Sequence, residues 1–230
     1  MVQFKSMRIL LILIFSLFIS FVASCQQPID SGFTNKAEAE NKMVNGLKEG
    51  KWVEYLGYRY DSNIKGWLAS LSLHVIPKDS NPRYFRLVVY TMGKPLGIER
   101  GYYMSGKKWY EVQYSNGKKN GIKKEYYESG EFESQTPYIN GLVVGTIKRY
   151  YKSGKLNLED YYTNEGRDSL LKRYFEKNGN LNYEILFTDS ENGIEKEYYE
   201  SGKLKRISKY SDDEIDGTIK TYDENGNEIK

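Results

Sequence analysis

Apolar and polar residues follow two different patterns along this chain. Residues 9–22 form an apolar run with only two serines in it, and the stretch that follows, up to residue 42, is polar and has no apolar periodicity. From residue 84 onward, short aromatic and aliphatic segments alternate with polar turns, as is typical of β-strands joined by hairpins. The pattern therefore separates an N-terminal segment from a β-rich remainder.

The β-rich part repeats itself every 24 residues. Each unit has an opening residue, a tyrosine five positions later, usually a second aromatic residue, and then a glycine. The opening residues are Gly97, Gly121, Gly145, Ser169, Gly193 and Gly217, and the tyrosines are Tyr102, Tyr126, Tyr150, Tyr174, Tyr198 and Tyr222. Two strand-like runs with two glycine turns predict a β-hairpin, and because one hairpin is marginal in water the copies must stack edge to edge.

We therefore expect an all-β protein, built as an elongated single-layer antiparallel sheet of 24-residue β-hairpin repeats. Residues 84–230 are predicted to form an array of six repeats. Residues 43–83 are predicted to hold a first repeat, marked by Gly50 and Tyr55, and a divergent hairpin insert. The abundance of tyrosine and glycine, 22 and 21 residues against 5 prolines, agrees with many short strands and turns.

The position of the turn sets which side chains face one another. With Ser129 and Gly130 at the tip of the hairpin, Tyr127 faces Phe132 and Lys124 faces Gln135. The same count predicts an aromatic-aliphatic core ladder on one face, from the pairs Tyr151 with Leu156, Phe175 with Leu181 and Tyr199 with Leu204. Tyr126 and Lys124 then lie together on the other face.

A column of cations also follows from this register. It places Arg100 opposite Glu111, Lys148 opposite Glu159 and Lys172 opposite Glu184, and such pairs are typical of a structural charge ladder. Lys124 and Lys196 face Gln135 and Ile207 instead. We expect these two lysines to keep unpaired positive charge, which leaves an anion-binding stripe open as an alternative.

The N-terminus has the features of an export signal. Lys5 and Arg8 precede the apolar run, whose 14 residues would span about 21 Å as a helix, short of the roughly 20 residues that cross a membrane. Residues 1–24 are therefore predicted to be a signal peptide. Residues 25–42, from Cys25 onward, are predicted to be a flexible tether.

Composition and charge exclude several classes of function. The formal net charge of +3 falls to +1 once the signal peptide is removed, so no excess charge favours nucleic acid. One histidine and one cysteine exclude most nucleophilic and zinc sites. The acidic cluster at residues 212–216 is expected to be a solvated turn, with calcium binding as the alternative. We expect no catalysis, no metal and no cofactor.

Two parts of the sequence resemble known families. Ala23 and Ser24 before the solitary Cys25 resemble the lipobox of bacterial lipoproteins, which implies lipidation of Cys25; an ordinary cleavage site and an uncleaved anchor stay open. The pattern from Tyr138 to Gly154, with Gly-Lys-Leu after the tyrosines, resembles the MORN repeat and its bacterial YwqK-type antitoxin variant. This resemblance covers residues 45–55 and 84–230, and it implies a hairpin-built sheet with a binding or scaffolding role.

The expected function is that of a lipid-anchored envelope protein, exported to the periplasmic face or the cell surface, which binds another protein along its sheet. The candidate binding residues are Tyr102, Tyr126, Tyr150, Tyr174, Tyr198, Lys124 and Lys196. Glycan binding is an alternative, because rows of tyrosine together with Trp52, Trp67 and Trp109 can stack on sugar rings. An envelope immunity or antitoxin-like role is a second alternative.

Overall fold

The strands of the protein pair into one open antiparallel sheet, in which each hairpin lies beside the next. The computed structural model describes residues 32–59, 72–76, 78, 80–163, 168–189, 192–211 and 214–229. The signal peptide, Cys25 and Trp67 lie outside these described residues. All described elements belong to the unit Ser31–Lys230.

The strands are short, and most hold six to ten residues. They are β1 (Lys42–Val44), β2 (Leu47–Arg59), β3 (Ser72–Ile76), β4 (Tyr84–Thr91), β5 (Lys94–Tyr103), β6 (Lys108–Ser115), β7 (Lys118–Lys119), β8 (Gly121–Tyr126), β9 (Phe132–Ile139), β10 (Leu142–Val143), β11 (Gly145–Tyr150), β12 (Leu156–Tyr162), β13 (Asp168–Tyr174), β14 (Leu181–Phe187), β15 (Asn192–Tyr198), β16 (Leu204–Ser211), β17 (Glu214–Tyr222) and β18 (Glu228–Ile229). A single 3-10 turn, η1 (Lys36–Glu38), precedes them in the described part of the chain.

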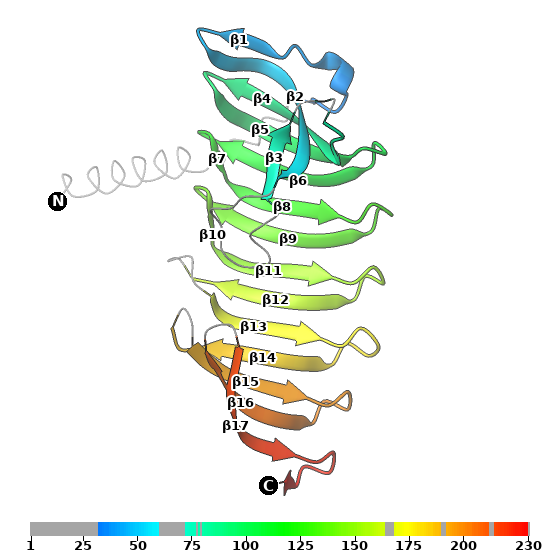
Figure 1. Cartoon of the computed structure of the whole chain (residues 1–230), viewed down its shortest axis with the longest axis vertical. Coiled ribbons are helices and arrows are strands. Elements are labelled where there is room, and N and C mark those ends of the chain that lie inside the picture. The colour runs from blue at the N-terminus through cyan, green and yellow to red at the C-terminus, as the bar shows by residue number, and fades with distance from the viewer. Residues whose placement is uncertain are drawn as a thin grey trace, which may run out of the picture. The chain divides into compact units, whose positions relative to one another are not determined.

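The strand pairing follows the chain order, as the colours of Figure 1 show. From β4 onward each strand of more than two residues pairs with the next such strand. The two-residue strands β7 and β10 pair with the ends of β6 and β9. The long strand β2 pairs with β1, β3 and β4 along different parts of its length. The predicted elongated single-layer sheet of hairpin repeats is confirmed. Among the described residues, no helix has the length and apolar character needed to cross a membrane.

Two kinds of turn join the strands. Asn116 and Gly117 connect β6 to β7 with φ of 52° and 77°, which only glycine and asparagine adopt readily, and this backbone matches the twist of a two-residue hairpin. At the other end of each repeat, Gly130 has φ of 109°, and its amide donates to the carbonyl of Tyr127 at 2.8 Å. The asparagine-glycine pairs therefore join successive repeats, while the second glycine closes the hairpin within a repeat.

The hairpin turn corrects the predicted ladder. Tyr127 donates its amide to the carbonyl of Glu131 at 2.9 Å, so the turn has three residues rather than two, and Tyr126 is the residue that faces Phe132. A bulge at Glu133 then restores the count, and Lys124 faces Gln135 as predicted. The predicted pair of Tyr127 with Phe132 is wrong, because the extra turn residue shifts the register by one residue. The bulge reverses this shift, but only beyond the tyrosines.

The same correction applies in the other repeats. The observed pairs are Tyr102 with Lys108, Tyr150 with Leu156, Tyr174 with Leu181, and Tyr198 with Leu204. The pairs predicted for Tyr151, Phe175 and Tyr199 are therefore wrong. The charge register is confirmed, with Arg100 opposite Glu111, Lys148 opposite Glu159 and Lys172 opposite Glu184.

The best-packed core lies at the N-terminal end of the sheet. Phe33, Phe85 and Leu87 are at most 6% exposed, and Val53 and Tyr102 pack against them. Phe33 belongs to the segment for which the sequence predicts a flexible tether. Its burial, together with the turn η1, shows that this part of residues 25–42 packs on the sheet.

Candidate functional site

The five predicted tyrosines share one face of the sheet, which we call the tyrosine face and define by Tyr102, Tyr126, Tyr150, Tyr174 and Tyr198. Side chains alternate between faces along a strand, so Lys124 and Tyr126 of β8 point to the same side. Each of the five tyrosines is half-buried. The rings of Tyr126 and Phe132 lie 5.8 Å apart, and those of Phe132 and Tyr150 lie 5.3 Å apart. The predicted binding residues therefore also form the aromatic ladder.

Carboxylates bind the tyrosine hydroxyls in the C-terminal half of this face. Tyr174 donates to Glu159 at 2.7 Å, and Tyr198 donates to Glu184 at 2.9 Å. Burial and the bond to Glu184 raise the pKa of Tyr198 to about 12, so its hydroxyl keeps its proton. Burial alone would raise the pKa of Glu159, but the bond from Tyr174 and the ion pair with Lys148 outweigh it and lower the pKa.

The lysines of the face differ in their partners. Lys148 lies 3.1 Å from Glu159, and Lys196 lies 3.6 Å from Glu184 of the preceding strand. The prediction that Lys196 keeps unpaired charge is wrong, because each strand has two neighbours and the carboxylate comes from the second one. Lys124 is exposed and, among the described residues, has no carboxylate oxygen within 4.0 Å.

The second tyrosine of each repeat has a role that the sequence analysis missed. Its hydroxyl donates to the backbone carbonyl of the first tyrosine of the next repeat, 23 residues later. The four bonds run from Tyr103 to Tyr126 at 2.9 Å, Tyr127 to Tyr150 at 2.7 Å, Tyr151 to Tyr174 at 2.8 Å, and Tyr199 to Tyr222 at 2.7 Å. The regular tyrosine doublet is the sequence signal for these inter-repeat bonds.

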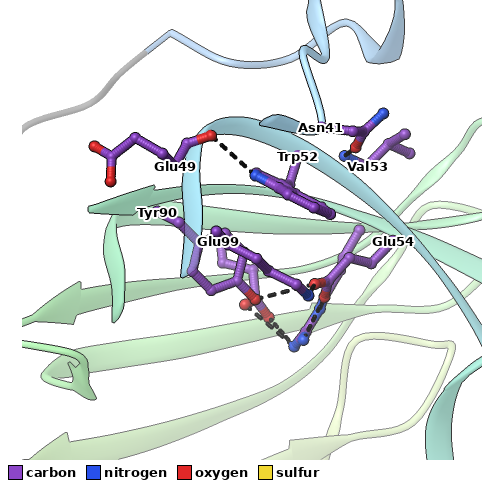
Figure 2. A network of polar contacts seen from close by, with 9 residues as sticks. Asn41, Glu49, Trp52, Val53, Glu54, Tyr90 and Glu99 are labelled. Carbon is purple, nitrogen blue, oxygen red and sulfur yellow. Dashed lines mark hydrogen bonds and ion pairs between the residues drawn. The ribbon is translucent and has the colours of Figure 1, made fainter. Parts of the chain in front are cut away.

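A buried ionic network lies near the N-terminal end of the sheet (Figure 2). Its residue Glu99 alternates in β5 with Arg100 and Tyr102, so the network lies on the face opposite the tyrosine face. Arg86 donates to Glu54 at 2.6 Å and lies 3.3 Å from Glu99, and both carboxylates are 3% exposed. Lys48 also pairs with Glu54, and Tyr90 donates to Glu54 at 3.1 Å. Each buried charge in this cluster has a partner, as burial requires.

The network shifts the titration of its members. Burial opposes the charged form of Glu54, but Arg86 and Lys48 outweigh it and lower the pKa of that carboxyl. Burial likewise opposes the charge of Arg86, and Glu99 and Glu54 outweigh it and raise the guanidinium pKa. Burial and Glu99 raise the pKa of Tyr110, whose hydroxyl donates to Glu99 at 2.5 Å. Tyr110 is therefore a neutral donor, and the cluster is a fixed structural unit.

A cavity of about 220 Å³ opens beside this network. Arg86 and Glu99 form part of its wall, and the remainder is lined by Leu56, Trp109, Tyr110, Tyr114, Lys119 and Lys123. Its residues come from the divergent N-terminal hairpins and the first regular repeats, so no periodic signal marks them. Among the described residues, no three histidine, cysteine or acidic side chains converge as metal ligands would.

Three segments of the chain match the family description "MORN repeat variant", at residues 119–140, 143–164 and 191–212. These three segments are similar to the MORN repeat variant, which supports the resemblance stated in the sequence analysis. No curated protein sequence matches the chain.

Two solved structures share limited similarity with the chain. A mutant of S. aureus TarM in complex with Fondaparinux, alpha-GlcNAc-glycerol and UDP is 12% identical, with a TM-score of 0.31 over 40% of this chain and 18% of that one. A second TarM structure is 14% identical, with a TM-score of 0.29 over 39% of this chain and 18% of that one. The chain spans under a fifth of the length of either protein.

Proposed function

We propose that the protein is a lipid-anchored, exported envelope protein that binds another protein along its tyrosine face and has no catalytic activity. The observation that carries the proposal is the open tyrosine column. Five half-buried tyrosines lie on one face, and protein interfaces are enriched in tyrosine and other aromatic residues. MORN-variant repeats agree with a binding or scaffolding role.

The anchor is proposed from the sequence around Cys25, which lies outside the described residues. Several acyl chains on this cysteine would hold the chain at the membrane, at about 0.8 kcal/mol per buried methylene group. The experiment is the change Cys25→Ala, followed by separation of membrane and soluble fractions. The protein is expected to leave the membrane fraction, and its retention there would refute lipid anchoring.

The binding face is tested by site-specific photocrosslinking in intact cells. A benzophenone amino acid replaces Tyr126 or Tyr150 on the tyrosine face, and the matched control replaces Arg149, which is exposed and precedes Tyr150 on the same strand but points to the other face. An adduct of one defined mass is expected from Tyr126 and Tyr150 and not from Arg149. Equal adducts from both faces, or none from the tyrosine face, would refute the proposal.

Glycan binding remains the second candidate, because the tyrosines of the face are half-buried and keep some ring surface accessible. The tryptophans favour it less. Trp52 donates its indole N–H to the carbonyl of Glu49 at 3.0 Å, and Trp109 lines the cavity on the face opposite the tyrosine face. Saturable binding on a glycan array that is lost in Tyr126→Ala, together with no protein adduct, would replace protein binding by glycan binding.

A further inference from the structure

The cavity beside the ionic network is lined by more hydrogen-bond donors than acceptors. It lies on the face opposite the tyrosine face, since Glu99 and Tyr110 alternate in their strands with residues of that face. Its one carboxylate, Glu99, is already bound by Arg86 and by the hydroxyl of Tyr110. Its acceptor capacity is therefore largely used within the protein.

Two donors of the same cavity have no acceptor among the described residues. Lys119 has no carboxylate oxygen within 4.0 Å, and its ammonium group lies 5.0 Å from the centre of the Tyr138 ring. The hydroxyl of Tyr114 donates to none of the described groups, and burial raises its pKa, so the proton stays on the oxygen. Lys123 differs, because it lies 2.5 Å from Glu125.

Among the described residues, one cation that lines the cavity, Lys119, has no ion pair and so carries a single uncompensated charge. Lys119 is partly buried, and burial together with the nearby charge of Lys123 lowers its pKa. An anion beside it would favour the charged form of Lys119 and oppose this lowering. Of the other two cations that line the cavity, Arg86 pairs with Glu54 and Glu99, and Lys123 pairs with Glu125.

We propose that this cavity binds a small-molecule monocarboxylate carried on a single ring. The ligand's carboxylate accepts from the ammonium group of Lys119 and from the hydroxyl of Tyr114, and its ring lies against Trp109. A monoanion matches the single uncompensated charge of Lys119, whereas a phosphate would bring a second negative charge toward the carboxylate of Glu99. The inference is independent of what binds the tyrosine face.

The size of the cavity supports a ligand with one ring. Pockets for drug-sized molecules measure roughly 300–1,000 Å³, and this cavity is smaller, at about 220 Å³. Its lining is more polar than that of most ligand sites, because Arg86, Glu99, Lys119 and Lys123 are four of its eight residues, and this favours a charged ligand over an apolar one. Benzoate and glucuronate both have one ring and one carboxylate, so they test the shared chemistry and separate an aromatic from a sugar ring.

The experiment is isothermal titration calorimetry of the purified protein with sodium benzoate and with sodium D-glucuronate. Glucose and inorganic phosphate are the comparison ligands. At least one carboxylate is expected to bind saturably and more tightly than glucose or phosphate. The change Lys119→Met is expected to weaken this binding about tenfold or more, because it removes a charged hydrogen-bond donor.

Three further variants test the roles of position, hydroxyl and charge separately. Lys118→Met is the matched control, because Lys118 is exposed on the neighbouring position of the same short strand, and it is expected to leave binding unchanged. Tyr114→Phe is expected to weaken binding by about two- to tenfold. Lys119→Arg keeps the charge and is expected to retain most of the affinity, which separates loss of the cation from loss of the fold.

The proposal is overturned if neither carboxylate binds saturably, or if phosphate or glucose binds as tightly as the carboxylates. It is also overturned if Lys119→Met and Lys118→Met change binding equally. Failure of crosslinking on the tyrosine face leaves these measurements unaffected, so the two proposals fail separately.

Discussion

Replacing Tyr127 by phenylalanine removes one hydroxyl and keeps the ring. This hydroxyl donates to the backbone carbonyl of Tyr150 at 2.7 Å and so joins one hairpin to the next. The adjacent residue supplies the control, because the hydroxyl of Tyr126 makes no hydrogen bond to the described residues. Both changes remove the same atom, and only one of them removes an inter-repeat bond.

The expected loss follows from the environment of the bond. A hydrogen bond contributes about 0.5–1.5 kcal/mol net, and Tyr127 is half-buried, so water can partly replace the lost donor. We expect Tyr127→Phe to lower the free energy of unfolding by about 1 kcal/mol. With a urea dependence of about 2–3 kcal/mol per molar, the unfolding midpoint falls by about 0.3–0.5 M.

The assay is urea unfolding followed by far-ultraviolet circular dichroism, with Tyr126→Phe measured in parallel. Tyr126→Phe is expected to leave the midpoint nearly unchanged. Combining Tyr127→Phe with Tyr199→Phe should add the two losses, because the two bonds are separated by several strands and share no partner. Equal midpoints for Tyr126→Phe and Tyr127→Phe would refute the argument that the second tyrosine holds successive hairpins together.

Three other changes probe the turns, the tight packing and the ionic network. Met92→Asn is expected to stabilise the protein by about 0.5–1 kcal/mol in thermal melts, because Met92 has φ of 48° in a turn where asparagine is favoured; a lower melting temperature would contradict this. Gly101→Ala should destabilise by about 1–3 kcal/mol in the same melts, since an added Cβ would lie 2.1 Å from the ring of Tyr110, and an unchanged melting temperature would contradict it. Glu54→Gln should destabilise the protein at neutral pH. The folded pKa of Glu54 is lowered, so its stabilisation is present above its unfolded pKa and is lost as the pH falls through the folded pKa. The difference in the free energy of unfolding between the variant and wild type, measured by urea unfolding at several pH values, should therefore shrink in acid. A difference independent of pH would contradict the assignment.

The repeat spacing was enough to predict the architecture but not the pairing near the turn. A period of 24 residues with two glycines permits one stacked arrangement of hairpins, and this gave the sheet and the register of Lys124 with Gln135. The predicted partners of the tyrosines differ from the observed ones by one residue. The choice between a two-residue and a three-residue turn depends on backbone angles, which the sequence pattern leaves open. The bulge at Glu133 returns the register to the predicted one, so the charge pairs beyond it agree with the prediction.

The ionic network and the cavity could not be predicted for a different reason. Glu54, Arg86 and Glu99 come from three strands of unlike sequence, β2, β4 and β5, and only the fold brings them together. Phe33 is a single apolar residue in a polar stretch, so nothing marked it as core. Periodicity locates what every repeat contains, whereas these features belong to individual repeats.

The fourth repeat shows that the contact between hairpins recurs even where the residues do not. Phe175 stands in the place of the second tyrosine and has no hydroxyl to donate. The longer turn of this repeat instead brings the side-chain amides of Asn178 and Asn180 to the carbonyl of Glu200, at 2.7 and 2.8 Å. A backbone carbonyl of the next repeat is thus bound by a side chain here as well. Because the link between repeats is kept by different chemistry, the substitution by Phe175 does not mark a weak point, and the tyrosine face continues across this repeat through Tyr174 and Tyr198.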